Sequence, residues 1–320
     1  MSGTVVITGA FSYTGKYTTR ILLSRGYGVR TLTSHPAGSR AGHDDPFAGR
    51  VRAFPYNFER PEELRHILEG ASTLINTYWV RFPHGGVTFE TAVRNTRTLI
   101  QSAKQAGVRR IVQVSIANPS LELPLAYYRG KAQVEEAVRA SGLSYAILRP
   151  TVIFGAEDIL INNIAWFVRN FPVFAIPGDG RYEIRPIYVE DMAALLASAV
   201  DGHENTVADA VGPETFAFEE LVRLIARVVG RKVRLVHVPA SMAWASTLLV
   251  GWMVRDVVLT WEEYRGLLDN LLFSDAPAAG ATRLSEWLAE HGDSVGQKYA
   301  SEVARHFERR GGAEIIVPIA

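Results

Sequence analysis

Short apolar runs alternate with segments of helical periodicity over the first half of the chain. The apolar runs are rich in Val, Ile and Leu and cover residues 5–8, 29–33, 51–56, 73–77, 110–115 and 145–149. Helices are predicted between them, at residues 17–25, 61–68, 89–106 and 128–141. Strands that are apolar throughout are buried on both faces, as in a parallel sheet covered by helices. The pattern therefore predicts an α/β fold, a doubly wound parallel sheet of the Rossmann type.

The pattern changes after Pro150. Aromatic residues, prolines and glycines become frequent, and later amphipathic helices are predicted at residues 218–229, 261–272 and 285–307. The longest mostly apolar stretch, residues 238–254, is at the short limit for a membrane span. We interpret it as a buried or pocket-lining helix. A helix lying in a membrane interface is the alternative, but the stretch lacks the Lys/Arg face that such helices usually have.

Composition narrows the classes of function. The chain of 320 residues has a formal net charge of +1, which gives no global field for nucleic acid, and its lack of cysteine excludes disulfides and thiolate chemistry. The eight histidines show no metal-ligand spacing, so we expect no metal. We see no signal peptide and expect a cytoplasmic protein without a transmembrane span, leaving peripheral membrane contact open. The expected partner is a small-molecule substrate, and the expected state is a monomer or homodimer.

The residues after the first predicted strand have the character of a phosphate-binding turn. They read Thr-Gly-Ala-Phe-Ser-Tyr-Thr-Gly at positions 8–15, between a strand and a helix. Gly9 allows the tight turn, Gly15 lets the helix approach the strand, and the helix N-terminus attracts phosphate. Ser12 takes the place of the usual middle glycine. We expect a dinucleotide pyrophosphate to be held by Gly9, Phe11, Ser12, Tyr13, Thr14 and Gly15.

The dinucleotide is predicted to be NADP(H) rather than NAD(H). NAD sites usually carry an acidic residue about 20 positions after the turn, but no Asp or Glu precedes Asp44 here. A carboxylate would repel a 2′-phosphate, so its absence favours NADP(H). The candidate contacts to that phosphate are Ser34, His35 and Arg40.

A catalytic group is predicted at the end of the fifth strand and the start of the next helix. Ser115 ends the strand, and Tyr127 and Lys131 lie four residues apart on one helix face. A lysine ammonium near a tyrosine lowers the tyrosine pKa by about 1–3 units, which makes the phenol a usable general acid or base. Ser115 can hydrogen-bond the same substrate oxygen. Tyr128 is the rival tyrosine, which we interpret as a pocket or core aromatic.

Together these motifs, with Leu-Arg-Pro-Thr-Val-Ile-Phe-Gly at positions 148–155, resemble the short-chain dehydrogenase/reductase superfamily. Within its extended/atypical NAD(P)-binding branch, the chain is similar to NmrA-like proteins and to the 39-kDa-type subunit of respiratory complex I. The resemblance spans roughly residues 4–200. It implies an NAD(P)-binding Rossmann core at residues 1–155, a substrate-side region with returning sheet elements at 156–310, and a tail at 311–320.

The resemblance also implies roles for single residues. Ser115, Tyr127 and Lys131 carry over as the catalytic triad, with Lys131 also on the nicotinamide ribose. Pro150, Thr151 and Phe154 are expected to line the nicotinamide. Further cofactor contacts carried over are Asn57 and Phe58 near adenine, and Asn76 and Thr77 near the adenosine or ribose. The residues expected in the substrate pocket are Tyr78, Trp79, Tyr128, Asn162 and Trp166.

The predicted activity is hydride transfer between NADP(H) and a carbonyl or alcohol of a small substrate, with Tyr127 as general acid/base. The aromatic pocket residues suggest an apolar or ring-containing substrate, although core packing explains them nearly as well. Two alternatives stay open. One is a non-catalytic NAD(P)-binding regulator or assembly factor; the other is an epimerase or dehydratase with bound NAD.

Overall fold

A seven-stranded parallel sheet forms the centre of the computed structural model, which describes residues 3–34, 45–83, 86–254 and 256–301. The strand order is β11-β6-β5-β4-β1-β2-β3, and every neighbouring pair is parallel. The strands are β1 (Thr4–Thr8), β2 (Gly28–Thr33), β3 (Val51–Pro55), β4 (Ala71–Asn76), β5 (Arg110–Val114), β6 (Ser144–Pro150) and β11 (Thr206–Ala210). The strand order reverses direction at β1, between β2 and β4, which is where such sheets bind ligands. The predicted doubly wound α/β fold is confirmed.

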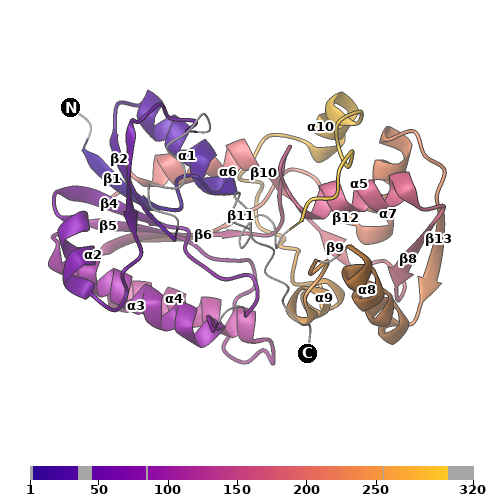
Figure 1. The fold of residues 1–320 in the computed structure, drawn as a ribbon, viewed down its shortest axis with the longest axis horizontal. Coiled ribbons are helices and arrows are strands. Elements are labelled where there is room, and N and C mark those ends of the chain that lie inside the picture. The colour runs from indigo at the N-terminus through magenta and orange to yellow at the C-terminus, as the bar shows by residue number, and fades with distance from the viewer. Residues whose placement is uncertain (1–2, 35–44, 84–85, 255, 302–320) are drawn as a thin grey trace.

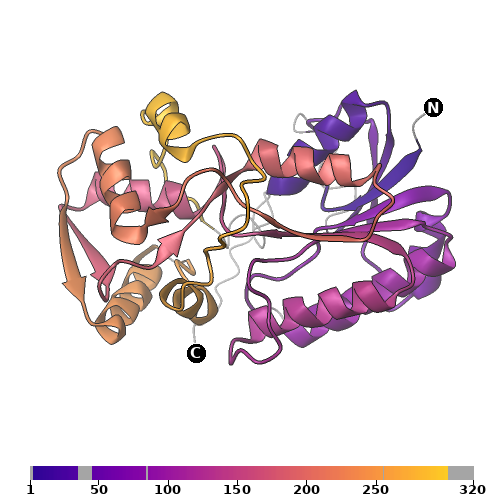
Figure 2. The same cartoon turned by 180° about the vertical axis from the view of Figure 1, so that it is seen from behind.

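Helices cover both faces of this sheet. Helices α1 (Tyr13–Ser24) and α6 (Val189–Ala199) pack together on one face, and the other face carries α2 (Pro61–Leu68), α3 (Phe89–Gln105) and α4 (Ala126–Ala140) (Figures 1 and 2). Burial on both faces explains why β1 is apolar throughout: Val5, Val6 and Ile7 are completely buried. Both α6 and β11 come from beyond residue 155, so the second half of the chain returns to the sheet.

The turn between β1 and α1 needs both of its glycines. Gly9 has a φ of +69°, a conformation that favours glycine. A Cβ atom on Gly15 would lie 1.9 Å from the carbonyl oxygen of Gly9, so only glycine lets the helix approach the strand this closely. Helix α1 begins at Tyr13, four residues before the predicted start, because its polar first turn hides the apolar periodicity.

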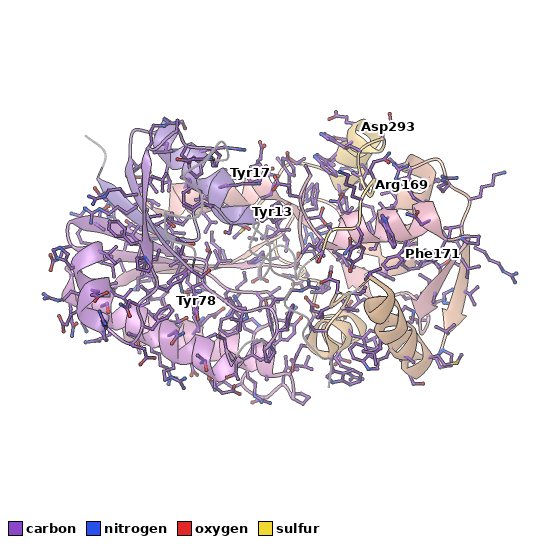
Figure 3. The ribbon with its side chains drawn as sticks, viewed as in Figure 1. Tyr13, Tyr17, Tyr78, Arg169, Phe171 and Asp293 are labelled. Carbon is purple, nitrogen blue, oxygen red and sulfur yellow. The ribbon has the colours of Figure 1, made fainter. Side chains whose placement is uncertain are left out.

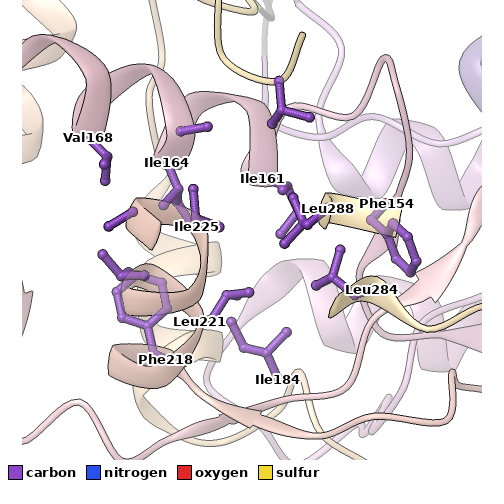
Figure 4. Packing of buried hydrophobic residues seen from close by; sticks show 14 of the residues in the cluster. Phe154, Ile161, Ile164, Val168, Ile184, Phe218, Leu221, Ile225, Leu284 and Leu288 are labelled. Carbon is purple, nitrogen blue, oxygen red and sulfur yellow. The ribbon is translucent and has the colours of Figure 1, made fainter. Parts of the chain in front are cut away.

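The second half of the chain builds a smaller lobe with its own core (Figure 1). Helices α5 (Leu160–Asn170), α7 (Phe218–Val228) and α10 (Leu284–His291) pack apolar side chains together, among them Ile161, Leu221 and Leu288 (Figure 4). Short strand pairs complete the lobe: β7 (Ile153–Phe154) with β10 (Ile187–Tyr188), β9 (Glu183–Ile184) with β12 (Phe216–Ala217), and β8 (Val173–Pro177) with β13 (Arg234–Val238).

Three predictions about later helices need correction. The helix expected at 285–307 is α10, which ends at His291; residues 302–307 lie outside the described part of the chain. The helix expected at 261–272 is α9 (Trp261–Leu268), which ends four residues earlier than expected. The apolar stretch does form a helix, α8 (Ala240–Val254), but among its described side chains Ala243 is buried whereas Met242 and Leu248 are 58% and 56% exposed, so one face is not covered. Among the described helices, none has the length and apolar character needed to cross a membrane.

Replacing Gly15 by alanine is expected to destabilise the fold by ~1–3 kcal/mol, because the new methyl group overlaps the Gly9 carbonyl. Urea unfolding measures the change. Gly28→Ala is the matched control, since a Cβ there meets only Thr4 Oγ1 at 3.4 Å. Equal stability of the two variants would show that the turn has room for a side chain.

Candidate functional site

The phosphate-binding turn rests on a hydrogen-bonded network at the carboxyl edge of β1 and β4. The Thr8 hydroxyl accepts from the Thr77 amide at 2.6 Å and donates to the Asn76 side chain at 3.3 Å. The Asn76 amide in turn donates to Gln113 at 2.8 Å. Asn76 is only 1% exposed and is bonded on both sides, so it helps to hold the turn in place, and its contact with the cofactor stays a prediction. Thr77, which is partly buried, stays a predicted cofactor contact.

The side chains of the turn itself are arranged around its two glycines. Ser12 is the extended N-cap residue of α1, and its side chain makes no capping hydrogen bond. Its hydroxyl lies close to both glycines, near the position that a Cβ atom would take on either Gly9 or Gly15. The Tyr13 hydroxyl lies against Gly155 of the second half, and Tyr13 and Tyr17 both project from α1 (Figure 3). The turn therefore fits a pyrophosphate: a glycine backbone, a helix N-terminus and a serine hydroxyl converge there.

Aromatic rings gather at the carboxyl end of β3, where adenine is expected. Phe58 stacks on Tyr56 at 5.3 Å between ring centroids, and Tyr78 lies 5.1 Å from each of them. The Tyr78 hydroxyl accepts a 2.9 Å hydrogen bond from Asn95, and Figure 3 shows Tyr78 in the same half of the molecule as α1. Asn57 donates at 2.6 Å to the exposed Glu63.

The residues expected at the 2′-phosphate are described only in part. Ser34 follows β2 directly and is exposed. His35 and Arg40 lie outside the described residues.

Ser115 is bound to a buried carboxylate that the sequence did not single out. The Ser115 hydroxyl donates to Glu135 Oε1 at 2.6 Å, and Arg149 on β6 donates to both Glu135 oxygens at 2.8 and 2.7 Å. Arg139 adds a contact at 2.8 Å. Burial alone would raise the pKa of Glu135, but these hydrogen bonds and the arginine charges lower it overall. The only sequence signal was an acid four residues after Lys131, on the same face of α4.

Lys131 is buried beside Ser115, with 4% of its surface exposed. Its ammonium donates to the carbonyl of Val114 at 3.3 Å and lies 4.7 Å from the centre of the Trp79 ring. Burial lowers the pKa of Lys131 to about 7, against the opposing charge of Glu135. Lys131 is therefore a group that can gain or lose a proton near neutral pH.

Tyr127 contacts the same Trp79 ring as Lys131. Its ring meets Trp79 edge-on at 5.8 Å and Phe89 at 5.7 Å. Burial raises the pKa of Tyr127 above the ordinary tyrosine value. The negative charge of Glu263 raises this pKa further, and the positive charge of Arg81 lowers it. The expectation that Lys131 lowers the pKa of Tyr127 is therefore wrong in this structure, because the charges that act on the phenol come from Arg81 and α9.

Helix α9 fixes the start of α4 from outside, which no sequence signal indicated. Glu262 accepts the backbone N–H groups of Ala126 and Tyr127, each at 3.2 Å, and so caps a helix that has no capping side chain of its own. Glu263 forms a two-pronged ion pair with Arg81. These partners are about 135 residues from Tyr127 along the chain, so no local motif reveals them.

Several predicted site residues have other surroundings. Phe154 is completely buried in the second core, where its ring lies 5.4 Å from Tyr188 and 5.7 Å from Trp287; its contact with the nicotinamide stays a prediction. The buried Pro150 ends β6, and the Thr151 hydroxyl donates to the carbonyl of Arg185.

Two residues predicted for the substrate pocket, Asn162 and Trp166, lie on α5 of the second lobe. The Asn162 amide donates to the Asp158 carbonyl at 3.0 Å and accepts from Gly296 at 3.2 Å, which ties α5 to neighbouring loops. Trp166 packs against Tyr299 and Phe171 in a separate aromatic cluster of the second lobe. Tyr128 is 2% exposed and packs against Gly266 of α9, which agrees with its interpretation as a core aromatic. Trp79 alone of the pocket residues contacts both Tyr127 and Lys131.

Residues 9–159 match the family model described as NAD(P)H-binding. This part of the chain is therefore similar to NAD(P)H-binding proteins, and the predicted resemblance to the atypical short-chain dehydrogenase/reductase branch is confirmed as a resemblance. The same fold recurs in the NADPH-dependent quinone oxidoreductase QOR2 of Escherichia coli, solved with NADPH. Its TM-score is 0.73 at 21% identity, over 89% of this protein and 99% of the other.

Curated relatives fall into two functional groups. The mitochondrial NADH dehydrogenase [ubiquinone] 1 alpha subcomplex subunit 9 of Arabidopsis thaliana is 25% identical over 86% of this protein and 72% of that one. The chloroplastic divinyl chlorophyllide a 8-vinyl-reductase of Oryza sativa subsp. indica is 28% identical over 79% and 65%, and the ceramide reductase of Caulobacter vibrioides is 27% identical over 78% of each. Two of these names specify an organelle, so a cytoplasmic location stays a prediction.

Replacing Glu135 by glutamine is expected to lower the free energy of unfolding at neutral pH by ~3–5 kcal/mol, because it removes one partner of a buried ion cluster. The pKa of Glu135 is lower in the folded protein than in the unfolded chain. Its contribution is therefore present above the unfolded pKa of about 4.3 and is lost as the pH falls through the folded pKa.

Urea unfolding of wild type and Glu135→Gln, at neutral pH and at the lowest pH where both fold, measures this difference. It should shrink toward acid pH. Glu136→Gln is the control, because Glu136 is the exposed neighbour. A difference that stays constant with pH would contradict the role assigned to the Glu135 charge.

Proposed function

We propose that this protein is an NADPH-dependent reductase that transfers hydride to a carbonyl group of a small apolar substrate. The observation that carries the proposal is the meeting of Tyr127 and Lys131 on the Trp79 ring, at the sheet edge beside the phosphate-binding turn. Two relatives are named as reductases, a vinyl-reductase and a ceramide reductase, which supports reduction as the kind of activity.

The cofactor would be held along this edge. The backbone of the turn at residues 9–15 would bind the pyrophosphate, the rings of Tyr56, Phe58 and Tyr78 would adjoin the adenine, and Lys131 would turn from Trp79 to the nicotinamide ribose. When bound, the reduced nicotinamide supplies the hydride. The residues of the chain then have to orient the carbonyl and deliver one proton.

Tyr127 is suited to donate that proton. Its phenol carries a proton that it can give to the substrate oxygen as hydride reaches the carbon. The products are an alcohol, oxidised cofactor and a phenolate that regains its proton from water.

A non-catalytic NAD(P)-binding role is the second candidate. It is favoured by the Ser115 hydroxyl, which is already bound to Glu135, and by the location of the Tyr127 phenol near Glu263 rather than Lys131. The similarity to the NADH dehydrogenase subunit over 86% of this protein supports the same interpretation.

Tyr127→Phe is expected to lower turnover by ~100-fold or more, because it removes only the proton donor, while the affinity for NADPH stays within about twofold. NADPH consumption with a panel of quinones, ring ketones and aldehydes measures turnover, and a fluorescence titration measures binding. Tyr128→Phe, which removes a neighbouring buried hydroxyl, is the control and should retain activity.

Full activity in Tyr127→Phe would rule out Tyr127 as the donor. If wild type binds NADPH but consumes it with no member of the panel, the non-catalytic role is the better account.

Preference for NADPH over NADH is the other part of the proposal. Ser34→Asp places a carboxylate where the 2′-phosphate is expected and should weaken NADPH binding by ~10-fold, about 1.4 kcal/mol, with little effect on NADH. Ser24→Asp adds the same charge at the far end of α1 and should change neither affinity. The prediction fails if wild type binds both dinucleotides equally well.

A further inference from the structure

Helix α8 presents an apolar face that the rest of the described chain leaves exposed. It contains no charged residue, and its exposed positions Ser241, Met242, Ala245 and Leu248 follow the spacing of one helix face. Met242 and Leu248 are 58% and 56% exposed. Large apolar side chains exposed together on one face indicate a surface that contacts something else.

The same face continues onto α9 through two tryptophans. Trp244 of α8 meets Trp261 of α9 edge-on at 5.2 Å. Trp261 is 51% exposed, and the Arg265 guanidinium lies 6.0 Å from its ring centre. Tryptophan beside a cation is typical of the interface between lipid headgroups and acyl chains.

Positive charge gathers in the segment of the chain that leads to α8, although α8 itself carries none. Residues 221–255 include six arginines and lysines and no Asp or Glu. Four of these cations, Arg227, Arg231, Lys232 and Arg234, are exposed, and within the described residues none of the four forms an ion pair. A protein with a formal net charge of only +1 therefore gathers a cationic segment here.

The fold brings these cations and the apolar residues to one lobe. Helix α8 follows β13 after a single residue, Pro239, and belongs to the same lobe as β13 and β8 (Figures 1 and 2). Arg234 begins β13 and is paired in register with Val173 of β8, which is 49% exposed. Phe171, 37% exposed, precedes β8 closely in the chain. Strand β8 also contacts α8.

We propose that this surface, the α8 face (Met242, Leu248 and Trp261, together with Arg231, Lys232 and Arg234 of the same lobe), docks on an anionic lipid bilayer. Apolar side chains would enter the headgroup boundary while the cations remain at the anionic surface, the two signals that stable peripheral binding needs. A second copy of the chain is a poorer occupant, because a symmetric contact would bring the cations of both copies together. The docking surface does not depend on the proposed reaction.

Vesicle flotation of the full chain tests the proposal. Wild type should float with mixed vesicles of phosphatidylcholine and phosphatidylglycerol at low salt, and much less at high salt or with phosphatidylcholine alone. Met242→Glu/Leu248→Glu and Arg231→Glu/Lys232→Glu should each reduce the bound fraction by ~10-fold or more, because each removes one of the two signals.

Matched controls place the same changes in the nucleotide-binding half. Val207→Glu introduces a carboxylate at a position that is 40% exposed on β11, and Arg94→Glu/Arg97→Glu reverses two exposed charges on α3. Both should float like wild type, and a dinucleotide titration confirms that every variant is folded.

The proposal is overturned if wild type stays unbound with mixed vesicles, if it binds phosphatidylcholine alone equally well, or if the α8-face variants float like the controls. Light scattering provides a further check. A dimer that Met242→Glu/Leu248→Glu dissociates, without vesicle binding by wild type, would identify the face as a contact between copies.

Discussion

A single buried carboxylate, that of Glu135, organises the edge of the sheet where the candidate site lies. It joins Ser115 after β5, Arg149 on β6 and Arg139 on α4, and its charge acts on Lys131. A charge that is 1% exposed is tolerated only when it is fully paired. Strand, helix and neighbouring strand must therefore take these positions together, and Ser115 and Lys131 are held close to each other as a result.

Helix α9 is the second element on which the site depends. Through Glu262 and Glu263 it fixes the start of α4 and Arg81, and through Tyr264 and Trp261 it packs on α8. One short helix thus lies between the candidate site and the exposed apolar face. A contact made by the second lobe can for this reason alter the surroundings of Tyr127 without involving the sheet.

The sequence predicts the fold well where burial alone determines the pattern. Inner strands such as β1 and β4 are apolar because both faces are covered, so their runs mark them directly, whereas the edge strand β11 is largely exposed and gave no such run. Helix α2 has the predicted bounds, with Pro61 at its first position and acids in its first turn. The start of α1 is less visible, because its first turn is polar. The two glycines of the turn could be predicted because the backbone requires glycine at both positions: Gly9 has a positive φ, and Gly15 lies against the Gly9 carbonyl.

The candidate site was only partly predictable. The spacing of Tyr127 and Lys131 fixes their helix face but not their partners, and the ammonium turns to Val114 and Trp79 while the phenol lies near Glu263. Phe154 and Trp166 showed only aromatic character, which core packing uses as readily as a pocket. The cations of the α8 lobe belong to the end of α7, the start of β13 and the connection between them, so the composition of α8 alone gave no sign of them.

A crystal structure of the protein with NADPH bound is the decisive measurement for the proposed reductase. We expect the pyrophosphate on the turn at residues 9–15, the Lys131 ammonium moved from Trp79 to the ribose hydroxyls, and the nicotinamide ring facing the Tyr127 hydroxyl. A nicotinamide located away from Tyr127, with the contact between Lys131 and Trp79 unchanged, would contradict a reductase built on these residues.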